Sequence, residues 1–265
     1  MKRLSVILVV FAIAISSAFA YKFKTSEFAF DAKMGLCDMD VQGNKIVVAC
    51  NGEYANKVCE MTVFLRENSV WTKLPSICNI NGEDTGLYSN LGHIIFDKEG
   101  NIWMTGKYLY KYSNGAWKAY FIDDEHKNIR KYLGLIVDAN GYIWASTQYY
   151  VDPTNYGTSL VRVKDDKLEV ILQTNDFSSI GCCGDANKAT AMIAFPDGSV
   201  GVQMPLAWGT NPGSNEDLFR FYPDGRVEKS VIDQLYYSID KAIRCMYAES
   251  NDKLWVCESK SSYST

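Results

Sequence analysis

The chain has 265 residues, a formal net charge of −4 and 47% hydrophobic residues, which is enough to build one all-β domain with a sizeable core. Its 31 acidic and 27 basic residues are interspersed, so we expect no basic face and no nucleic-acid partner. After residue 20 no stretch is long and apolar enough for a membrane span.

The first 20 residues read as a secretory signal peptide. Lys2 and Arg3 form a positive start, Leu4–Ile15 is an apolar run, and Ala18-Phe19-Ala20 is a small-x-small cleavage site. The alternative is an uncleaved N-terminal anchor. We expect a signal peptide at 1–20 and one domain at 21–265, in a protein that is secreted, periplasmic or at the cell surface.

A short word recurs five times along the rest of the chain. Each copy is a tight turn followed by an apolar or aromatic strand, at intervals of roughly 40 to 57 residues, which is typical of a β-propeller blade. The turn residues of the five copies are Asn44, Gly100, Gly141, Gly198 and Asp252.

Each repeat predicts two β-hairpins. The five repeats cover approximately 36–75, 91–122, 133–173, 189–231 and 243–258. The first predicts strands at Leu36–Val41, Lys45–Ala49, Glu60–Leu65 and Ser69–Leu74. The second predicts Leu91–Phe96, Asn101–Thr105, Tyr108–Tyr112 and Ala116–Phe121. The third predicts Leu133–Val137, Tyr142–Ser146, Ser159–Val163 and Leu168–Leu172. The fourth predicts Ala189–Phe195, Ser199–Gln203, Asp217–Tyr222 and Arg226–Val231. The fifth predicts only Ile243–Ala248 and Lys253–Glu258.

The expected fold is therefore all-β, a propeller of four-stranded blades with four full repeats and a partial fifth. Two ways of completing the ring stay open. Strands from Tyr21–Lys33, which contains Phe23, Phe28 and Phe30, would close a ring of five blades. Alternatively, the chain is an incomplete part of a larger propeller.

The words at Asp97–Trp103 and Asp138–Trp144, with the strand Leu109–Tyr112, give a family resemblance. They resemble the two-component regulator propeller repeat, which is similar to streptogramin-lyase-like and NHL-like propellers. The resemblance implies an extracytoplasmic sensor that recognises glycans, working with a partner protein. Val47 and Gly201 stand where this pattern has Trp. We interpret Trp103, Trp144 and Trp255 as packing residues between blades.

The connections between second and third strands and between successive repeats are long, and in a four-stranded blade both leave from the same end, so nearly all the long loops are expected there. Binding residues concentrate in such loops. A glycan or peptide ligand is the expected partner there. The candidate binding residues are Tyr88, His126, Tyr149, Tyr150 and Trp208, and His93 is a candidate at the channel or between blades. An enzyme resembling streptogramin lyase or a lactonase, acting through His93, is one alternative, and a purely structural propeller is another. The sequence favours a binding module over an enzyme, and we expect no catalytic set, metal or cofactor.

Eight cysteines in an exported chain suggest disulfides. Cys50 and Cys59 flank one loop, Cys182 and Cys183 are adjacent, and Cys37 and Cys245 occupy equivalent places on the first strands of their repeats. Free thiols, or pairing with other cysteines, are the alternatives for each.

Overall fold

A computed structural model of the chain describes residues 35–51, 61–77, 79–80, 83–84, 93–120, 129–150, 156–174, 192–204, 217–231 and 241–260. The chain divides after Met34 into two units, and all of these residues belong to the unit Gly35–Thr265. Within them there are strands and turns and no helix, and thus no helical segment suited to crossing a membrane. The expected all-β class is confirmed.

Four consecutive stretches each form a four-stranded sheet, which we call blades 1 to 4. Blade 1 contains β1 Gly35–Gln42, β2 Lys45–Asn51, β3 Met61–Glu67 and β4 Val70–Lys73. Blade 2 contains β7 Ile94–Phe96, β8 Ile102–Thr105, β9 Leu109–Ser113 and β10 Ala116–Tyr120. Blade 3 contains β11 Ile129–Val137, β12 Ile143–Tyr150, β13 Tyr156–Lys164 and β14 Lys167–Thr174. Blade 4 contains β15 Met192–Ala194, β16 Val200–Met204, β17 Asp217–Phe221 and β18 Val227–Val231.

Two smaller sheets complete the described residues. Strands β19 Lys241–Ser250 and β20 Lys253–Lys260 form a two-stranded sheet, which we call blade 5. A short hairpin of β5 Asn79–Ile80 and β6 Glu83–Asp84 lies in the connection between blades 1 and 2, where the sequence predicted only a loop. Ile77 and Ile80 of this connection are buried, and the Trp117 indole donates to the Pro75 carbonyl at 2.9 Å.

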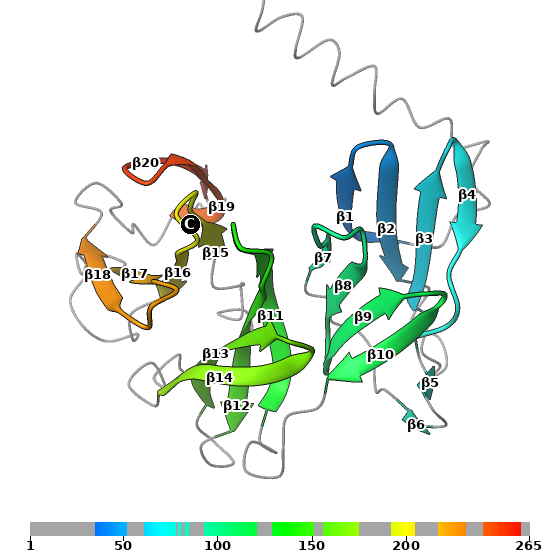
Figure 1. The fold of residues 1–265 in the computed structure, drawn as a ribbon, viewed down its shortest axis with the longest axis horizontal. Helices are drawn as coiled ribbons and strands as arrows, with labels where there is room; N and C mark the ends of the chain where they lie inside the picture. The colour runs from blue at the N-terminus through cyan, green and yellow to red at the C-terminus, as the bar shows by residue number, and fades with distance from the viewer. Residues whose placement is uncertain are drawn as a thin grey trace, which may run out of the picture. The chain divides into compact units, whose positions relative to one another are not determined.

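Every blade is an antiparallel meander in chain order (Figure 1). The first strands of successive blades are in contact, β1 with β7, β7 with β11, β11 with β15 and β15 with β19. Repeated meanders joined through their first strands are the architecture of a β-propeller, so the predicted fold is confirmed. The number of blades is a separate matter, because residues 21–33 lie outside the described residues.

The tight turns follow the chemistry that the repeated word predicts. Gly100, Gly141 and Gly198 all have positive φ, between 83° and 90°, a conformation that glycine adopts without a steric penalty. In blade 1 the positive φ falls on Gly43, at 59°, and not on the neighbouring Asn44 that the repeat alignment selected. A glycine at the first central position of a two-residue hairpin is the type II′ arrangement, so this turn is one residue shorter than the others.

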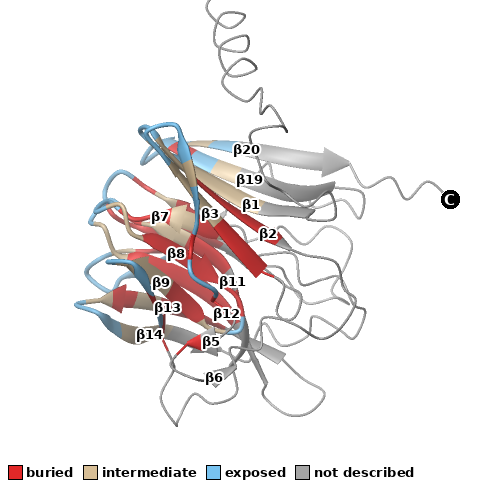
Figure 2. Cartoon of the chain, turned by 90° about the vertical axis from the view of Figure 1, so that its right-hand side faces the viewer, coloured by how far each residue is buried: buried red, intermediate tan, exposed pale blue. Residues whose placement is uncertain are grey.

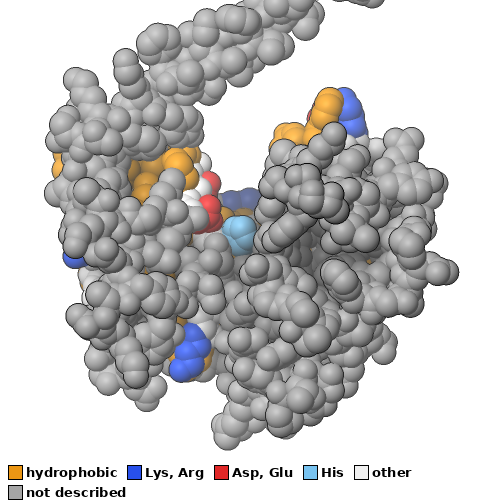
Figure 3. All heavy atoms as spheres, turned by 180° about the vertical axis from the view of Figure 1, so that it is seen from behind, with side chains coloured by type: hydrophobic (Ala, Val, Ile, Leu, Met, Phe, Trp, Pro, Cys, Tyr) orange, Lys and Arg blue, Asp and Glu red, His pale blue; other side chains and the backbone are white. Residues whose placement is uncertain are grey.

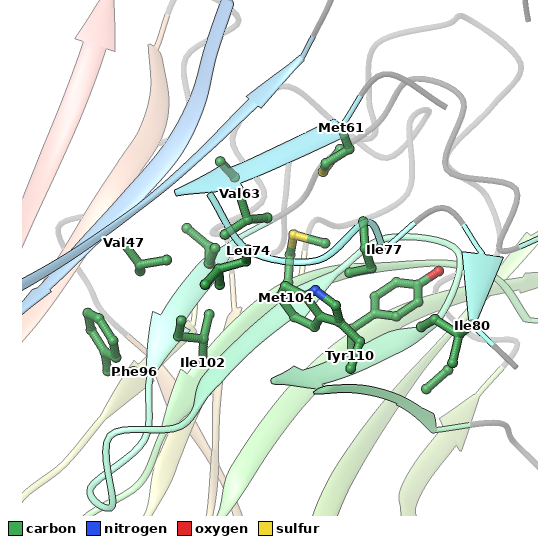
Figure 4. Packing of buried hydrophobic residues seen from close by; sticks show 14 residues of the cluster. Val47, Met61, Val63, Leu74, Ile77, Ile80, Phe96, Ile102, Met104 and Tyr110 are labelled. Carbon is green, nitrogen blue, oxygen red and sulfur yellow. The ribbon is translucent and has the colours of Figure 1, made fainter. Parts of the chain in front are cut away.

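Apolar clusters join each blade to the next. The largest connects blades 1 and 2 through Val47, Val63, Phe96, Ile102 and Met104, and Figure 4 shows their side chains meeting between the two sheets. Similar clusters join blades 2 and 3, blades 3 and 4, and blades 4 and 5. Figure 2 shows buried residues along the strands and exposed residues at the hairpin turns. Blades therefore stabilise one another face to face.

A buried Asp–Trp pair anchors the first hairpin of blades 2 and 3. Asp97, 4% exposed, accepts hydrogen bonds from the Asn101 backbone and from the Trp103 indole at 2.8 Å. Asp138 does the same for Trp144 at 2.9 Å. The two indoles are 2% and 1% exposed and pack against the following blade. Burying such a side chain contributes roughly 1.5–3 kcal/mol, and the packing prediction for both is confirmed.

Blade 4 replaces this pair with different residues. Phe195 stands at the Asp position and Gly201 at the Trp position, and the Arg220 guanidinium from β17 lies 4.0 Å from the Phe195 ring centroid. Arg220 donates to the Ser199 hydroxyl, to Asp197 and to the Asn251 carbonyl of blade 5. Burial raises the pKa of Asp197, but hydrogen bonds from Ser199 and Arg220 outweigh it and lower that pKa.

Candidate functional site

The two ends of the blades differ in how they are joined. At the end with the short turns, hydrogen bonds link successive blades. Gln42 donates to the Asp97 carbonyl at 2.7 Å, Lys98 donates to the Ala139 carbonyl, and the Asp197 amide donates to Asn251 at 3.1 Å. The long connections leave from the opposite end, which we call the loop end. Because side chains at the turn end are used in hydrogen bonds between blades, the loop end is the candidate site for binding.

Several predicted site residues lie outside the described residues, so the predictions about them stay predictions. These are Tyr88, His126, Trp208, Cys59, Cys182 and Cys183. Tyr149, Tyr150, His93, Cys37, Cys50 and Cys245 fall on described backbone.

Blade 3 projects beyond blade 2 at the loop end. Strand β8 ends at Thr105, which corresponds to Ser146 in β12, but β12 continues for four more residues to Tyr150. At about 3.3 Å per residue this extends the sheet by roughly 13 Å. The amide of Tyr132 in β11 donates to the Gly106 carbonyl at 2.8 Å, at the level where blade 2 turns. The strands of blade 3 therefore extend past the end of blade 2, with β11 paired to β12 as far as Tyr149 and β12 paired to β13 as far as Tyr150. We call this extension the β12–β13 ribbon.

Tyr149 and Tyr150 belong to this ribbon and not to a loop. The predicted strands end at Ser146 and begin again at Ser159, but β12 and β13 pair without interruption as far as Tyr150 and Tyr156. Tyr149 is opposite Gly157, and Tyr150 is opposite Tyr156. The strands extend this far because Thr147, Tyr149, Tyr150 and Tyr156 all favour β structure, which a search for repeated words does not reveal.

His93 lies at the joint between blades 1 and 2. Its Nδ1 is 3.5 Å from a carboxylate oxygen of Asp38 on β1, an ion pair whenever the imidazole is protonated. The same oxygen accepts the Ile94 amide at 2.8 Å. The side chains of His93 and Asp38 are 42% and 30% exposed, so solvent reaches them. Figure 3 shows a His side chain beside acidic side chains.

Thr105 completes this joint from the second strand of blade 2. Its hydroxyl accepts the His93 amide at 2.7 Å, and its amide donates to the His93 carbonyl at 2.9 Å. Asp40, two residues along β1, accepts the Phe96 amide at 2.7 Å. The first strands of blades 1 and 2 are thus held together by two aspartates. Sequence reasoning missed Asp38 and Asp40, although their spacing of two on one strand places both on the same face.

A buried hydroxyl lies near the level of Gly106. Tyr132 is 2% exposed, and its hydroxyl has no hydrogen-bond partner among the residues that the structure describes. Burial, with further contributions from Tyr110 and Tyr108, raises its pKa above the ordinary tyrosine value. The group stays protonated and neutral at any physiological pH, so it offers a hydrogen-bond donor and no charge.

The described residues contain no group of three or more His, Cys, Asp or Glu arranged to hold a metal ion. What they present is one imidazole–carboxylate pair, several tyrosines on a projecting ribbon and buried hydroxyls. This set can donate and accept hydrogen bonds and stack against flat apolar surfaces.

The cysteine predictions are partly located. Cys50 is buried on β2, at 2% exposure. Cys37 lies on β1 at a break in its pairing with β2, and Cys245 is directly opposite Cys257 in the register of β19 and β20. The proposed pairings stay predictions, and the backbone register places Cys257, which the sequence analysis did not consider for Cys245, directly opposite it.

Comparison with known proteins gives a likeness of fold. No family model and no curated protein matches the chain. A protein assigned as a gluconolactonase matches 71% of this chain over 59% of its own, with 12% identity and a TM-score of 0.43. The match to a luciferin-regenerating enzyme covers 87% of this chain and 70% of the enzyme, with 12% identity and a TM-score of 0.49. The match to the β-propeller domain of the Trilobed protease from Pyrococcus furiosus covers 88% of this chain and 79% of that domain, with 10% identity and a TM-score of 0.38.

The chain thus spans about three fifths of the first of these structures. Identities of 10% to 12% with TM-scores below 0.5 carry no argument about activity. The strand order and the contacts between successive blades identify the chain as a β-propeller.

Proposed function

We propose that the protein is an exported binding module of the sensory type that recognises a glycan or peptide at its loop end. The observation that carries this proposal is the step between blades 2 and 3. There the β12–β13 ribbon with Tyr149, Tyr150 and Tyr156 extends past the end of blade 2, whose first strand follows the solvent-accessible His93 that pairs with Asp38. A rigid strand pair holds its residues in place without the entropy that a loop must lose on binding.

The chemistry of these residues suits a sugar or peptide ligand. Tyrosine combines an apolar ring for stacking with a hydroxyl for hydrogen bonding, and it has few rotatable bonds to immobilise. Residues directly opposite in an antiparallel pair share one face of the sheet, so Tyr150 and Tyr156 belong to one face. The resemblance to the two-component regulator propeller repeat and the predicted signal peptide support the same reading. A sensory role requires a partner protein to carry the signal.

An enzyme is the second candidate, and the His93–Asp38 pair is what favours it. A carboxylate beside imidazole Nδ1 is the arrangement that orients a histidine as a general base. However, the Asp38 oxygen that faces His93 also accepts the Ile94 amide. The joint between the blades accounts for the pair without catalysis, so binding is the stronger proposal.

The test is a glycan and peptide array probed with the purified chain, with and without Ca²⁺ and Mg²⁺. Binding is expected to need no metal and to be lost in Tyr150→Ala and Trp208→Ala. Tyr222→Ala, beside the β17–β18 turn at the opposite end of blade 4, is the matched control and should bind normally. A folded wild-type protein that binds nothing on the array would contradict the proposal. Turnover of a lactone or glycan that His93→Ala abolishes would favour the enzyme.

A further inference from the structure

At the step between blades 2 and 3, the connection from the second to the third strand of blade 2 is very short. It consists only of Gly106, Lys107 and Tyr108, whereas residues 52–60, 151–155 and 205–216 make the same connection in blades 1, 3 and 4. The Gly106 amide donates to the Tyr108 carbonyl at 3.0 Å, and the Gly106 carbonyl accepts the Tyr132 amide of β11 at 2.8 Å. Strand β11 also contacts β8 (Figure 1). This connection, which we call the floor of the step, is therefore fixed to blade 3.

One face of blade 3 is turned towards the floor. Ala145 of β12 and Tyr132 of β11 pack in the cluster shared with blade 2. Successive residues of a strand alternate between its two faces, so Tyr149 belongs to the same face as Ala145, four residues further along β12. The residue directly opposite Tyr149 is Gly157, so β13 adds no side chain beside Tyr149 on this face.

The floor presents a cation. Lys107 is exposed, and its ammonium group lies 5.1 Å from the centroid of the half-buried Tyr108 ring. The Tyr108 ring in turn meets the fully buried Tyr110 ring edge-on, with 6.1 Å between their centroids. Within the described part of the chain, Lys107 has no carboxylate partner, unlike Lys118, which pairs with Asp166. A cation held over an aromatic ring keeps its hydrogens available for an anionic ligand.

Charge is distributed unevenly between the two ends of blades 2 and 3. Lys107 in the floor and Arg130 and Lys131 at the start of β11 place positive charge at the step. The buried Tyr132 beside them stays neutral, because burial raises its pKa. The described acidic residues of these two blades lie in or close to the short turns at the opposite end, and they are Asp97, Glu99, Asp138, Asp165, Asp166 and Glu169. The described residues at the step therefore favour an anionic ligand, although the whole chain has a net charge of −4.

We propose that the step binds an acidic sugar, a pyranose that carries a carboxylate, with its ring against the Tyr149 face and its carboxylate on Lys107. The proposal rests on the proposed function and specifies its ligand class and its contacts. A sugar ring offers a flat apolar face that suits an aromatic side chain. The carboxylate of a uronic acid projects from the edge of that ring, so one residue can contact the Tyr149 face and the floor together. A neutral sugar would use the Tyr149 face alone.

The test compares two ligands that differ only in charge. Calorimetry measures the binding of a short oligogalacturonate and of its carboxyl-reduced, neutral counterpart to the full chain. The acidic ligand is expected to bind about 3- to 10-fold more tightly, as for a partly exposed ion pair. The difference should shrink as salt increases.

Variants assign the difference to the floor. Lys107→Gln should abolish the preference and leave the affinity for the neutral ligand unchanged, whereas Lys107→Arg should retain the preference. Lys167→Gln is the matched control, because Lys167 is an exposed lysine beside the β13–β14 turn at the opposite end, and it should behave as the wild type. Tyr149→Ala should weaken the binding of both ligands.

Four results would overturn the proposal. Equal affinities in the wild type would show that the step is no carboxylate site, including the case in which Asp123, Asp124 and Glu125, outside the described residues, neutralise Lys107. A preference that persists in Lys107→Gln would place the carboxylate elsewhere. A glutamate-rich peptide that binds through Lys107 more tightly than the oligogalacturonate would make the ligand an acidic peptide. A folded chain that binds neither member of the pair but binds other glycans contradicts this inference alone, whereas a chain that binds nothing on the glycan and peptide array contradicts the proposed function as well.

Discussion

Blade 3 and blade 4 hold the same place in the repeat with different chemistry. In blade 3 the Trp144 indole fills the space towards the next blade and donates to buried Asp138. In blade 4, Gly201 has no side chain at that position, and Arg220 from the neighbouring strand occupies the space and donates to Asp197 and to the Asn251 carbonyl of blade 5. The repeat thus conserves a contact between blades rather than a residue type.

The two solutions also differ in kind. An indole contributes mainly through burial, which depends little on salt or pH. The guanidinium contributes through charged hydrogen bonds, and its side chain is 13% exposed, next to Asp197 at 29%. Trp144 should therefore contribute more to the free energy of unfolding than Arg220 does. Only the contribution of Arg220 should depend strongly on salt.

The largest expected effect is that of Trp144→Ala. Removing this 1% exposed indole should lower the free energy of unfolding by about 3–5 kcal/mol. Trp144→Phe should cost about 1–3 kcal/mol, because buried Asp138 loses its donor. Urea unfolding measures both. Trp71→Ala, at a half-buried position of blade 1, is the control and should lower the free energy of unfolding by less. Equal losses for Trp71→Ala and Trp144→Ala would show that the buried Trp144 does not stabilise the fold more than an ordinary tryptophan.

Grafting the anchor of blade 2 onto blade 4 tests whether the two solutions are interchangeable. Gly201→Trp alone should destabilise by about 1–3 kcal/mol, because Arg220 already occupies the space. Adding Phe195→Asp and Arg220→Lys restores the residue set of Asp97, Trp103 and Lys111, and should recover most of the loss. If the triple variant is destabilised by the sum of the effects of its three single substitutions, the residue sets of blades 2 and 4 are not interchangeable.

Arg220→Ala should have a smaller effect, about 1–2 kcal/mol, because the interactions it removes are partly exposed. Arg220→Lys should not restore the loss, since one ammonium group cannot reach Ser199, Asp197 and Asn251 in the same geometry. Unfolding at low and high salt distinguishes this anchor from that of Trp144. Only the Arg220 variant should lose part of its destabilisation as salt increases.

The sequence predicted the strands and turns of the repeats well because their signals are local. A turn glycine with positive φ and the alternating apolar strand beside it can both be recognised from a segment of about ten residues, as at Gly100 and Gly141. The anchor of blade 4 could not be predicted, because Arg220 and Phe195 are 25 residues apart and meet only through strand pairing. The His93–Asp38 joint was missed for the same reason. The length of blade 3 was hidden because its extra residues lie outside the repeated word.

The smallest expected effect concerns the joint between blades 2 and 3. Asp166 of the β13–β14 turn accepts hydrogen bonds from Lys118 and Tyr120 of β10, and these lower its pKa. Burial, followed by the bond to Asp166, raises the pKa of Tyr120. Because the folded-state pKa of Asp166 lies below the unfolded value, its contribution is present above about pH 4 and is lost as pH falls through the folded value.

The melting temperature of Asp166→Asn should therefore lie below that of the wild type at pH 7, and the difference should shrink as the pH falls below about 4. The raised pKa of Tyr120 has the opposite sign, so its contribution is retained below about pH 10 and is lost above that. Tyr120→Phe should reduce the alkaline loss, of which Tyr132 with its raised pKa retains a share. It should leave part of the acid loss, because Lys118 still pairs with Asp166. Asp224→Asn, on an exposed turn of blade 4, is the control. A difference for Asp166→Asn that stays constant from pH 7 to pH 3 would show that its charge does not hold the two blades together.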